Sequence, residues 1–171
     1  MKKIIVLFAL CTTMRGIQAQ VSYMHSFGGS YYFNLTNIYE SWQGLSYNGR
    51  LIYKQMKEIT LDAGARPGVG FYYDPYYGGF LAFDIPVTAD INAGFGSSKG
   101  DNSDIGGFLG IGGDYNYLNG YPYPTTGVIF TGGIRFMLFD RPIELNAAYV
   151  GDLSQYKQNL LDIGISYLIN Y

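Results

Sequence analysis

His25 is the only histidine of the chain, and Cys11 is its only cysteine. Catalysis by a histidine base would therefore have to use His25, with Ser26 and Ser30 as the nearest hydroxyl groups in the sequence. The glycine-rich stretches "GGSYYF" and "GIGGDY" lack the strand-to-helix setting of a phosphate-binding loop. We therefore expect no cofactor, no metal site and no catalytic residue.

The first nineteen residues have the layout of a secretory signal peptide. Lys2 and Lys3 precede an apolar run over residues 4–10, and the segment ends in Ala19. The run is too short to span a bilayer, so we expect cleavage after Ala19 and one mature domain over residues 20–171. Cys11 is then removed, which excludes disulfides, thiol catalysis and cysteine metal ligands from the mature chain.

The composition is unusual for a soluble domain. Charged residues make up 14% of the chain, against about 25% in ordinary soluble domains. The chain holds 18 Tyr and 24 Gly, and its formal charge is -2. Without a clustered basic surface, a nucleic-acid partner is not expected.

Alternation with period two dominates after residue 20 and predicts eight β-strands. The strands are expected over residues 25–34, 45–55, 58–72, 80–95, 104–116, 126–139, 142–150 and 158–171. The first two have the weakest pattern, which leaves open a six-stranded core with an irregular N-terminal part. Long aromatic connections alternate with short polar ones, as in transmembrane barrels. A two-residue turn at Asp140 and Arg141 would pair Leu138 with Ile143 and keep both apolar sets on one face.

One face of the predicted strands carries small polar residues and charges of both signs. In "LDIGISYLINY", for example, Asp162, Gly164 and Ser166 alternate with apolar residues. Such side chains suit the narrow interior of an eight-stranded barrel, where unpaired charges would be costly. We expect a network of lumen charges, with Arg135 pairing diagonally with Glu144. Its members are Arg50, Asp62, Arg66, Asp84, Asp90, Asp114, Arg135, Glu144 and Asp162.

The other face is apolar and essentially uncharged, with aliphatic residues in the middle and aromatic residues towards both ends. A lipid-facing surface has this arrangement. The sequence therefore predicts an all-β fold, an eight-stranded antiparallel up-and-down transmembrane β-barrel. The alternation alone would also fit a secreted soluble barrel that carries an apolar ligand inside.

The predicted strands, the signal peptide and the aromatic C-terminus resemble the small eight-stranded outer-membrane β-barrels of Gram-negative bacteria, which include OmpX and the membrane domain of OmpA. The resemblance covers residues 25–171 and implies an outer-membrane location and contact with outer-membrane lipid. It also implies that the barrel-assembly machinery reads the last strand during biogenesis. The matching residues here are Tyr167, Ile169 and Tyr171.

Enzymes of eight strands that modify lipid A resemble this chain in the number of strands. They use a His with Ser or acidic partners. His25 begins the first strand, at the periplasmic end, whereas a deacylase acting on the outer leaflet needs its His at the far end. We therefore expect a structural or adhesive protein without enzyme activity, and keep a lipid-modifying enzyme that uses His25 as an alternative.

Aromatic residues of the long connections are the candidates for recognition of an extracellular protein or glycan, because Tyr and Trp combine apolar area with a hydrogen-bonding group. The alternative role for each is anchoring in the headgroup region. The candidates are Trp42, Tyr72, Tyr73, Tyr76, Tyr77, Tyr121 and Tyr123.

Overall fold

The computed structural model describes residues 22–36, 41–56, 59–74, 78–98, 103–119, 124–154 and 157–170. The predicted signal peptide lies outside these residues. Among the described residues, no helix is long and apolar enough to cross a membrane. The strands are β1 (Ser22–Asn34), β2 (Trp42–Met56), β3 (Ile59–Ala65), β4 (Gly68–Asp74), β5 (Gly78–Asp84), β6 (Val87–Gly94), β7 (Ile105–Leu118), β8 (Thr125–Leu138), β9 (Arg141–Asp152) and β10 (Leu160–Leu168).

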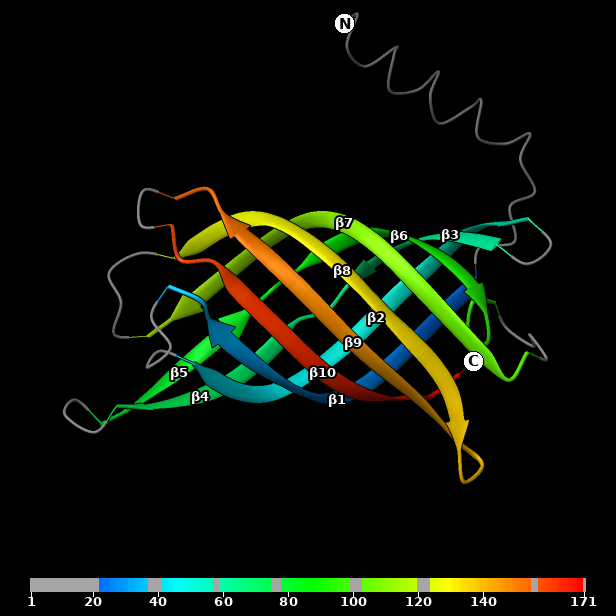
Figure 1. Cartoon of the computed structure of the whole chain (residues 1–171), viewed down its shortest axis with the longest axis horizontal. Helices are drawn as coiled ribbons and strands as arrows, with labels where there is room; N and C mark the ends of the chain where they lie inside the picture. The colour runs from blue at the N-terminus through cyan, green and yellow to red at the C-terminus, as the bar shows by residue number, and fades with distance from the viewer. Residues whose placement is uncertain are drawn as a thin grey trace, which may run out of the picture.

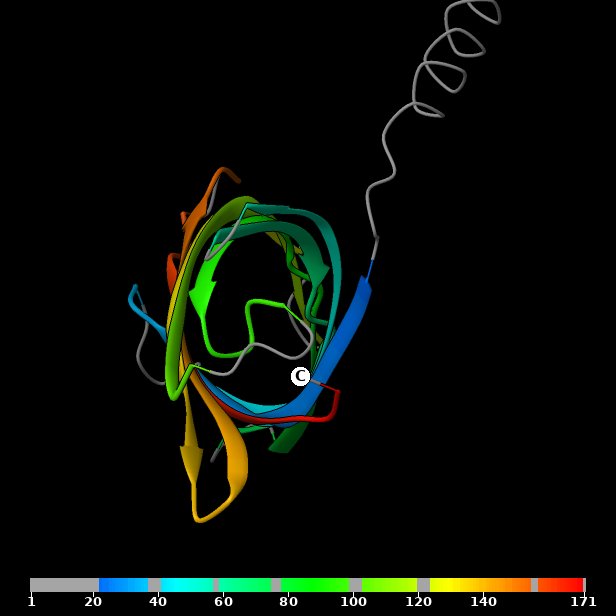
Figure 2. The same ribbon diagram turned by 90° about the vertical axis from the view of Figure 1, so that its right-hand side faces the viewer.

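The strands form one closed antiparallel barrel (Figures 1 and 2). Each strand position pairs with the next one along the chain, and β1 pairs with both β2 and β10, which closes the sheet on itself. β3 and β4 together occupy one strand position, and β5 and β6 another, so the barrel has eight strands. The first two predicted strands therefore complete the barrel, and the irregular N-terminal part does not occur.

Two prolines divide the third and fourth predicted strands. Pro67 separates β3 from β4, and Pro86 separates β5 from β6. Because proline has no N–H group to donate, the ladder is interrupted at these points. The Arg66 N–H donates to the Pro86 carbonyl at 3.1 Å, and the Tyr47 N–H donates to the Pro67 carbonyl at 3.0 Å. These bonds keep the barrel wall continuous across both breaks.

The β8–β9 turn differs from the predicted one by one residue. Phe139 and Asp140 form the turn, both with positive φ, and Leu138 pairs with Arg141. Two-residue hairpins favour this backbone conformation. A turn at Asp140 and Arg141 would have needed an N–H from Pro142 to close it, which proline lacks. The resulting register shift of two residues leaves both apolar sets on the predicted face.

The apolar set faces outward along every strand. Leu45, Val69, Leu109 and Ile165, from four different strands, are all between 47% and 73% exposed. The alternate positions carry polar residues that are buried inside the barrel. This is the arrangement of a transmembrane barrel and the reverse of a soluble carrier with an apolar interior.

We call the two ends of the barrel the turn end and the loop end. The turn end holds the start of β1, the end of β10, the Phe139–Asp140 turn and the segment Gly94–Ser98. The loop end holds the connections between β1 and β2, β4 and β5, β7 and β8, and β9 and β10 (Figure 1).

Candidate functional site

The structure places the nine predicted lumen charges inside the barrel, and each is at most 9% exposed. Three ion pairs lie in the lumen, of which two join neighbouring strands and one, Arg66 with Asp162, joins residues far apart in the sequence. Arg50 Nη1 lies 3.6 Å from Asp62 Oδ2, and Arg66 Nη1 lies 3.5 Å from Asp162 Oδ2. Arg135 and Glu144 form the third pair. Because all three pairs are withdrawn from water, they constrain which strands can meet inside the barrel.

Arg135 occupies the centre of the layer nearest the turn end. Its Nε donates to Glu144 Oε2 at 2.6 Å, and its Nη1 donates to Asn92 Oδ1 at 2.8 Å. Its guanidinium also lies 4.4 Å from the ring centre of Phe108, within the range of a cation–π contact. Arg135 and Glu144 are directly opposite residues of β8 and β9, not the diagonal pair that was predicted.

The segment Gly94–Ser98 folds into the turn end of the barrel, and Figure 2 shows the chain crossing the interior there. Its residues Phe95, Ser97 and Ser98 are buried. The Gly96 carbonyl accepts hydrogen bonds from Arg135 Nη1 at 3.1 Å and Arg50 Nη1 at 3.4 Å. The sequence predicts a strand up to residue 95 and a short polar connection after it, and the glycine and serine content gives no sign of the inward fold.

The middle and the loop-end half of the lumen contain more carboxylates than guanidinium groups. Arg66 is the arginine of this region and also donates to the Thr131 hydroxyl at 3.4 Å. Asp84 accepts a hydrogen bond from the Asn116 amide at 3.2 Å. Asp114 is also buried here. Across the nine predicted residues, three arginines face six carboxylates, so the lumen environment is acidic.

Aromatic side chains fill the lumen at the loop end. Tyr32 and Trp42 stack with ring centres 3.6 Å apart, and Tyr72 stacks on Phe80 with ring centres 5.9 Å apart. Gly70 allows this packing, since a Cβ atom there would lie 2.2 Å from Trp42 Cε3. The interior is therefore closed by rings at this end.

The predicted recognition residues separate into three groups. Trp42 and Tyr72 are 2% and 5% exposed and point into the lumen. Tyr73 is 66% exposed on the outer face at the loop end. The remaining predictions lie outside the described residues: Tyr76, Tyr77, Tyr121 and Tyr123.

His25 lies on the outer face near the turn end, between two tyrosines. Its ring stacks on Tyr23 with ring centres 5.4 Å apart, and the Tyr47 hydroxyl lies 3.3 Å from its Nδ1. The Tyr23 and Tyr47 hydroxyls also hydrogen-bond to each other. Ser26 and Ser30 point into the lumen, on the opposite side of the barrel wall. The serine–histidine arrangement that hydrolysis would need is therefore not formed by these residues.

The end of the chain is held against β1. The Ile169 N–H donates to the His25 carbonyl at 2.9 Å, and the His25 N–H donates to Asn170 Oδ1 at 2.8 Å. Leu168, the one apolar residue on the inward side of the last strand, packs against Met24 and Ile52 inside the turn end. Tyr167 and Ile169 face outward. Tyr171 lies outside the described residues.

The described residues leave little free space in the middle of the lumen. A cavity of about 10 Å³ lies beside Arg66, Asp90 and Arg135, which is room for about one water molecule. Side chains therefore fill most of the space around these three residues.

No family model and no curated protein matches the chain. Solved structures do resemble it. Ail of Yersinia pestis, in complex with the heparin analogue sucrose octasulfate, aligns with a TM-score of 0.54 at 12% identity, covering 87% of this chain and 99% of Ail. Neisserial surface protein A aligns with a TM-score of 0.53 at 12% identity, covering 88% and 99%. OprG of Pseudomonas aeruginosa aligns with a TM-score of 0.50 at 11% identity, covering 90% and 98%.

These likenesses concern the fold. The chain has the fold of the small eight-stranded outer-membrane β-barrels, as the residue pattern predicted. The described interior of this barrel holds the inward-folded segment at one end and the stacked rings at the other.

Proposed function

We propose that the protein is a non-conducting integral protein of the outer membrane of a Gram-negative bacterium, with a structural or adhesive role. The observation that carries the proposal is the combination of an apolar outer face with a lumen of buried polar side chains that includes three ion pairs. The outer face requires lipid around it, and the packed lumen leaves no water-filled path for solutes.

Export and assembly follow from this location. Residues 1–19 act as a cleaved signal peptide, and residues 20–171 form the barrel domain. The barrel-assembly machinery recognises the last strand through Tyr167, Ile169 and Tyr171. The outward placement of Tyr167 and Ile169 next to β1 supports this role, because both side chains are accessible at the seam of the barrel.

The tyrosines of the loop end supply the adhesive surface, and its partner is an extracellular protein or glycan. Tyr73 supports this assignment, since its ring is 66% exposed at the end of β4, beside the connection that carries Tyr76 and Tyr77. Trp42 and Tyr72 have a different task, which is to close the lumen beneath that surface. Aromatic residues at the outer ends of other strands hold the barrel at the headgroup level.

Cell fractionation tests the location. The protein should be recovered in the outer membrane, and the detergent-extracted protein should migrate faster on a gel before boiling than after it. Recovery as a soluble periplasmic or secreted protein would contradict the proposal. Reconstitution into planar bilayers tests the packed lumen, and stable ion-conducting channels would contradict it.

Binding of expressing cells to immobilised host-surface proteins and glycans tests the adhesive role. Replacing Tyr73, Tyr76 and Tyr77 together by Ser should reduce binding, while the gel shift stays unchanged. A matched control replaces the turn-end aromatic Phe139, which is 90% exposed, by Ser. Equal binding by both variants and the unmodified protein would contradict the role of these tyrosines. Hydrolysis or acylation of lipid A that His25→Ala abolishes would favour the enzyme instead.

A further inference from the structure

Two tyrosines and the histidine converge on the outer face of the barrel near the turn end. Tyr23 and His25 lie two residues apart on β1, and Tyr47 lies on β2. The register pairs His25 with Gly49, so a position without a side chain lies between the two tyrosines. A Cβ atom at Gly49 would lie 3.1 Å from the Tyr23 hydroxyl oxygen and 3.5 Å from Tyr47 Cε1. The missing side chain therefore lets the two hydroxyl groups meet above β2.

Three atoms that can bind a metal ion come together above Gly49. The Tyr23 and Tyr47 hydroxyl groups hydrogen-bond to each other, and the Tyr47 hydroxyl oxygen lies 3.3 Å from His25 Nδ1. A first-row metal ion holds nitrogen and oxygen ligands at about 2.0–2.1 Å, which places neighbouring ligands about 2.8–3.4 Å from each other. The separation between the Tyr47 oxygen and Nδ1 is within that range, so both atoms can bind one ion with little movement.

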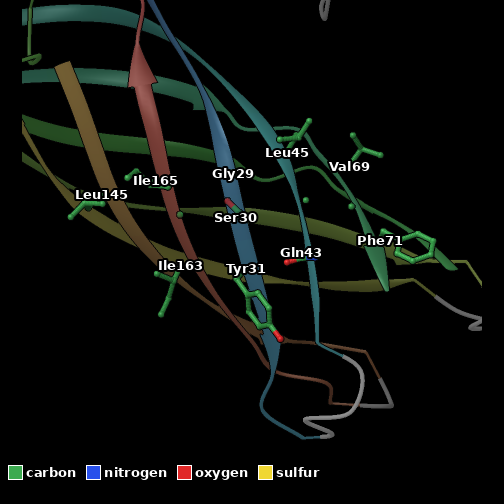
Figure 3. Close-up of a pocket in the computed structure, with 13 residues that line it drawn as sticks. Gly29, Ser30, Tyr31, Gln43, Leu45, Val69, Phe71, Leu145, Ile163 and Ile165 are labelled. Carbon is green, nitrogen blue, oxygen red and sulfur yellow. The ribbon is translucent and has the colours of Figure 1, made fainter. Parts of the chain in front are cut away.

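The outward tyrosine at the other end of β1 is arranged differently. Tyr31 is 41% exposed, and Figure 3 shows its ring pointing towards the loop end. The groove beside it has no histidine among its described lining residues. A tyrosine at a membrane interface usually directs its hydroxyl group to water. Tyr23 and Tyr47 instead direct theirs to each other and to His25.

The ligand types favour a hard ion of high charge. Among the described residues, no group of three or more His, Cys, Asp or Glu side chains could hold a metal ion, so this cluster depends on its phenol groups. A phenol holds its proton at neutral pH, and the ion must displace that proton to bind the oxygen. Fe³⁺ has the charge to do so, and iron accepts a tyrosine ligand in haem proteins. Soft ions prefer thiolates, which the expected mature chain lacks.

We propose that Tyr23, Tyr47 and His25 bind one ferric ion at the turn end of the barrel. Both phenol groups lose their protons to water and bind as phenolates, and the neutral imidazole donates the lone pair of Nδ1. Because the tyrosines are 44% and 38% exposed, the remaining positions of the ion are open to water or a small chelating acid. The iron stays ferric, so no electron is transferred. This site goes beyond the structural or adhesive role and replaces the sequence-based expectation of no metal site.

Titration of the folded, detergent-extracted protein with ferric nitrilotriacetate tests the site. Phenolate bound to Fe³⁺ gives a charge-transfer absorption band in the visible range, and metal analysis after gel filtration gives the stoichiometry. The unmodified protein should bind one iron, and Tyr23→Phe and Tyr47→Phe should each weaken the band strongly. His25→Ala should lower the affinity more than about tenfold, since even a partner behind a metal ligand contributes that much. Tyr31→Phe, on the same strand, should bind iron normally.

Two glycine variants test the geometry without removing a ligand. Gly49→Val places a side chain where the two hydroxyl groups meet, so it should lower the affinity for iron at least as much as His25→Ala does. Gly113→Val adds the same side chain to β7, where a Cβ atom meets nothing within 4 Å. This control should bind iron like the unmodified protein.

Three results would overturn the inference. They are the absence of the band in the unmodified protein, a band of full strength in the Tyr23→Phe, Tyr47→Phe double variant, and displacement of Fe³⁺ by an equal concentration of Zn²⁺ or Cu²⁺. The heat-dependent gel shift, measured on every sample, shows whether each variant is a folded barrel. A protein that shifts normally but binds no iron overturns the ferric site and leaves the proposed location intact.

Discussion

Arg135 and Glu144 face each other directly across the β8–β9 hairpin, with Nε 2.6 Å from Oε2 and neither side chain exposed. Arg135 also donates to Asn92 and to the Gly96 carbonyl. One guanidinium group thus connects the hairpin, β6 and the segment that fills the turn end.

Removing one member of this pair should strongly destabilise the barrel. Glu144→Ala leaves a buried guanidinium without its carboxylate, which should cost about 3–5 kcal/mol in the free energy of unfolding. Arg135→Ala should cost a similar amount, and the double variant should cost clearly less than the sum of both. Urea unfolding in lipid vesicles, followed by the fluorescence of the single tryptophan, measures all three. Additive costs would show that the two side chains act independently.

Gly96 should be hard to replace because two effects combine there. Its φ is +66°, and a Cβ atom would lie 2.9 Å from Arg135 Cδ and 3.1 Å from Leu168 Cδ2. Gly78 has φ +89° with nothing within 4 Å, so it isolates the backbone effect. Gly78→Ala should cost about 1–2 kcal/mol, and Gly96→Ala should cost more. Equal unfolding free energies for the two variants would mean that the segment Gly94–Ser98 does not pack against Arg135.

Trp42 should be shielded from water. Because its ring stacks on Tyr32 and is 2% exposed, aqueous acrylamide should quench its fluorescence weakly in the folded protein and strongly after unfolding. The control moves the fluorophore to an exposed turn, in a Trp42→Phe, Phe139→Trp double variant, where quenching should be strong before unfolding. Strong quenching of Trp42 in the folded protein would show that it is exposed to water, as expected for one of the predicted recognition residues.

A charged side chain on the outer face should destabilise the barrel, and the loss of stability should increase with the depth of the residue in the membrane. Leu109 is 73% exposed near the middle of β7, and Ile105 is 69% exposed at the strand's turn end. Leu109→Arg should cost about 2–4 kcal/mol and Ile105→Arg about 0–1 kcal/mol in a bilayer. Unfolding in vesicles gives both values. If the two costs were the same, the outer face would not follow a membrane profile.

Alternation and residue type together predict which side of each strand faces inward. Asp62, Asp162 and Glu144 share a face with small polar residues, which predicts that they lie in the lumen, and they do lie there. The alternation also predicts the position of Trp42, if the second strand is extended towards its beginning. Trp42 lies an even number of residues before Ser46 and Asn48, which both face inward. Its side chain is therefore expected in the lumen, where the structure places it.

Other features depend on contacts between distant residues, which the local residue pattern does not predict. The inward fold of Gly94–Ser98 is held by Arg50 and Arg135 from distant strands. Pro142 did carry a usable signal, because its missing N–H excludes it from closing the β8–β9 turn.

The central claim is that the apolar face of this barrel meets lipid. A spin label on Leu109→Cys in a bilayer tests it most directly, because the expected mature chain has no other cysteine. Collisions with oxygen, which concentrates in hydrocarbon, should be frequent, and collisions with a water-soluble nickel complex should be rare. Frequent collisions with the nickel complex and rare ones with oxygen would place this face in water and contradict the claim.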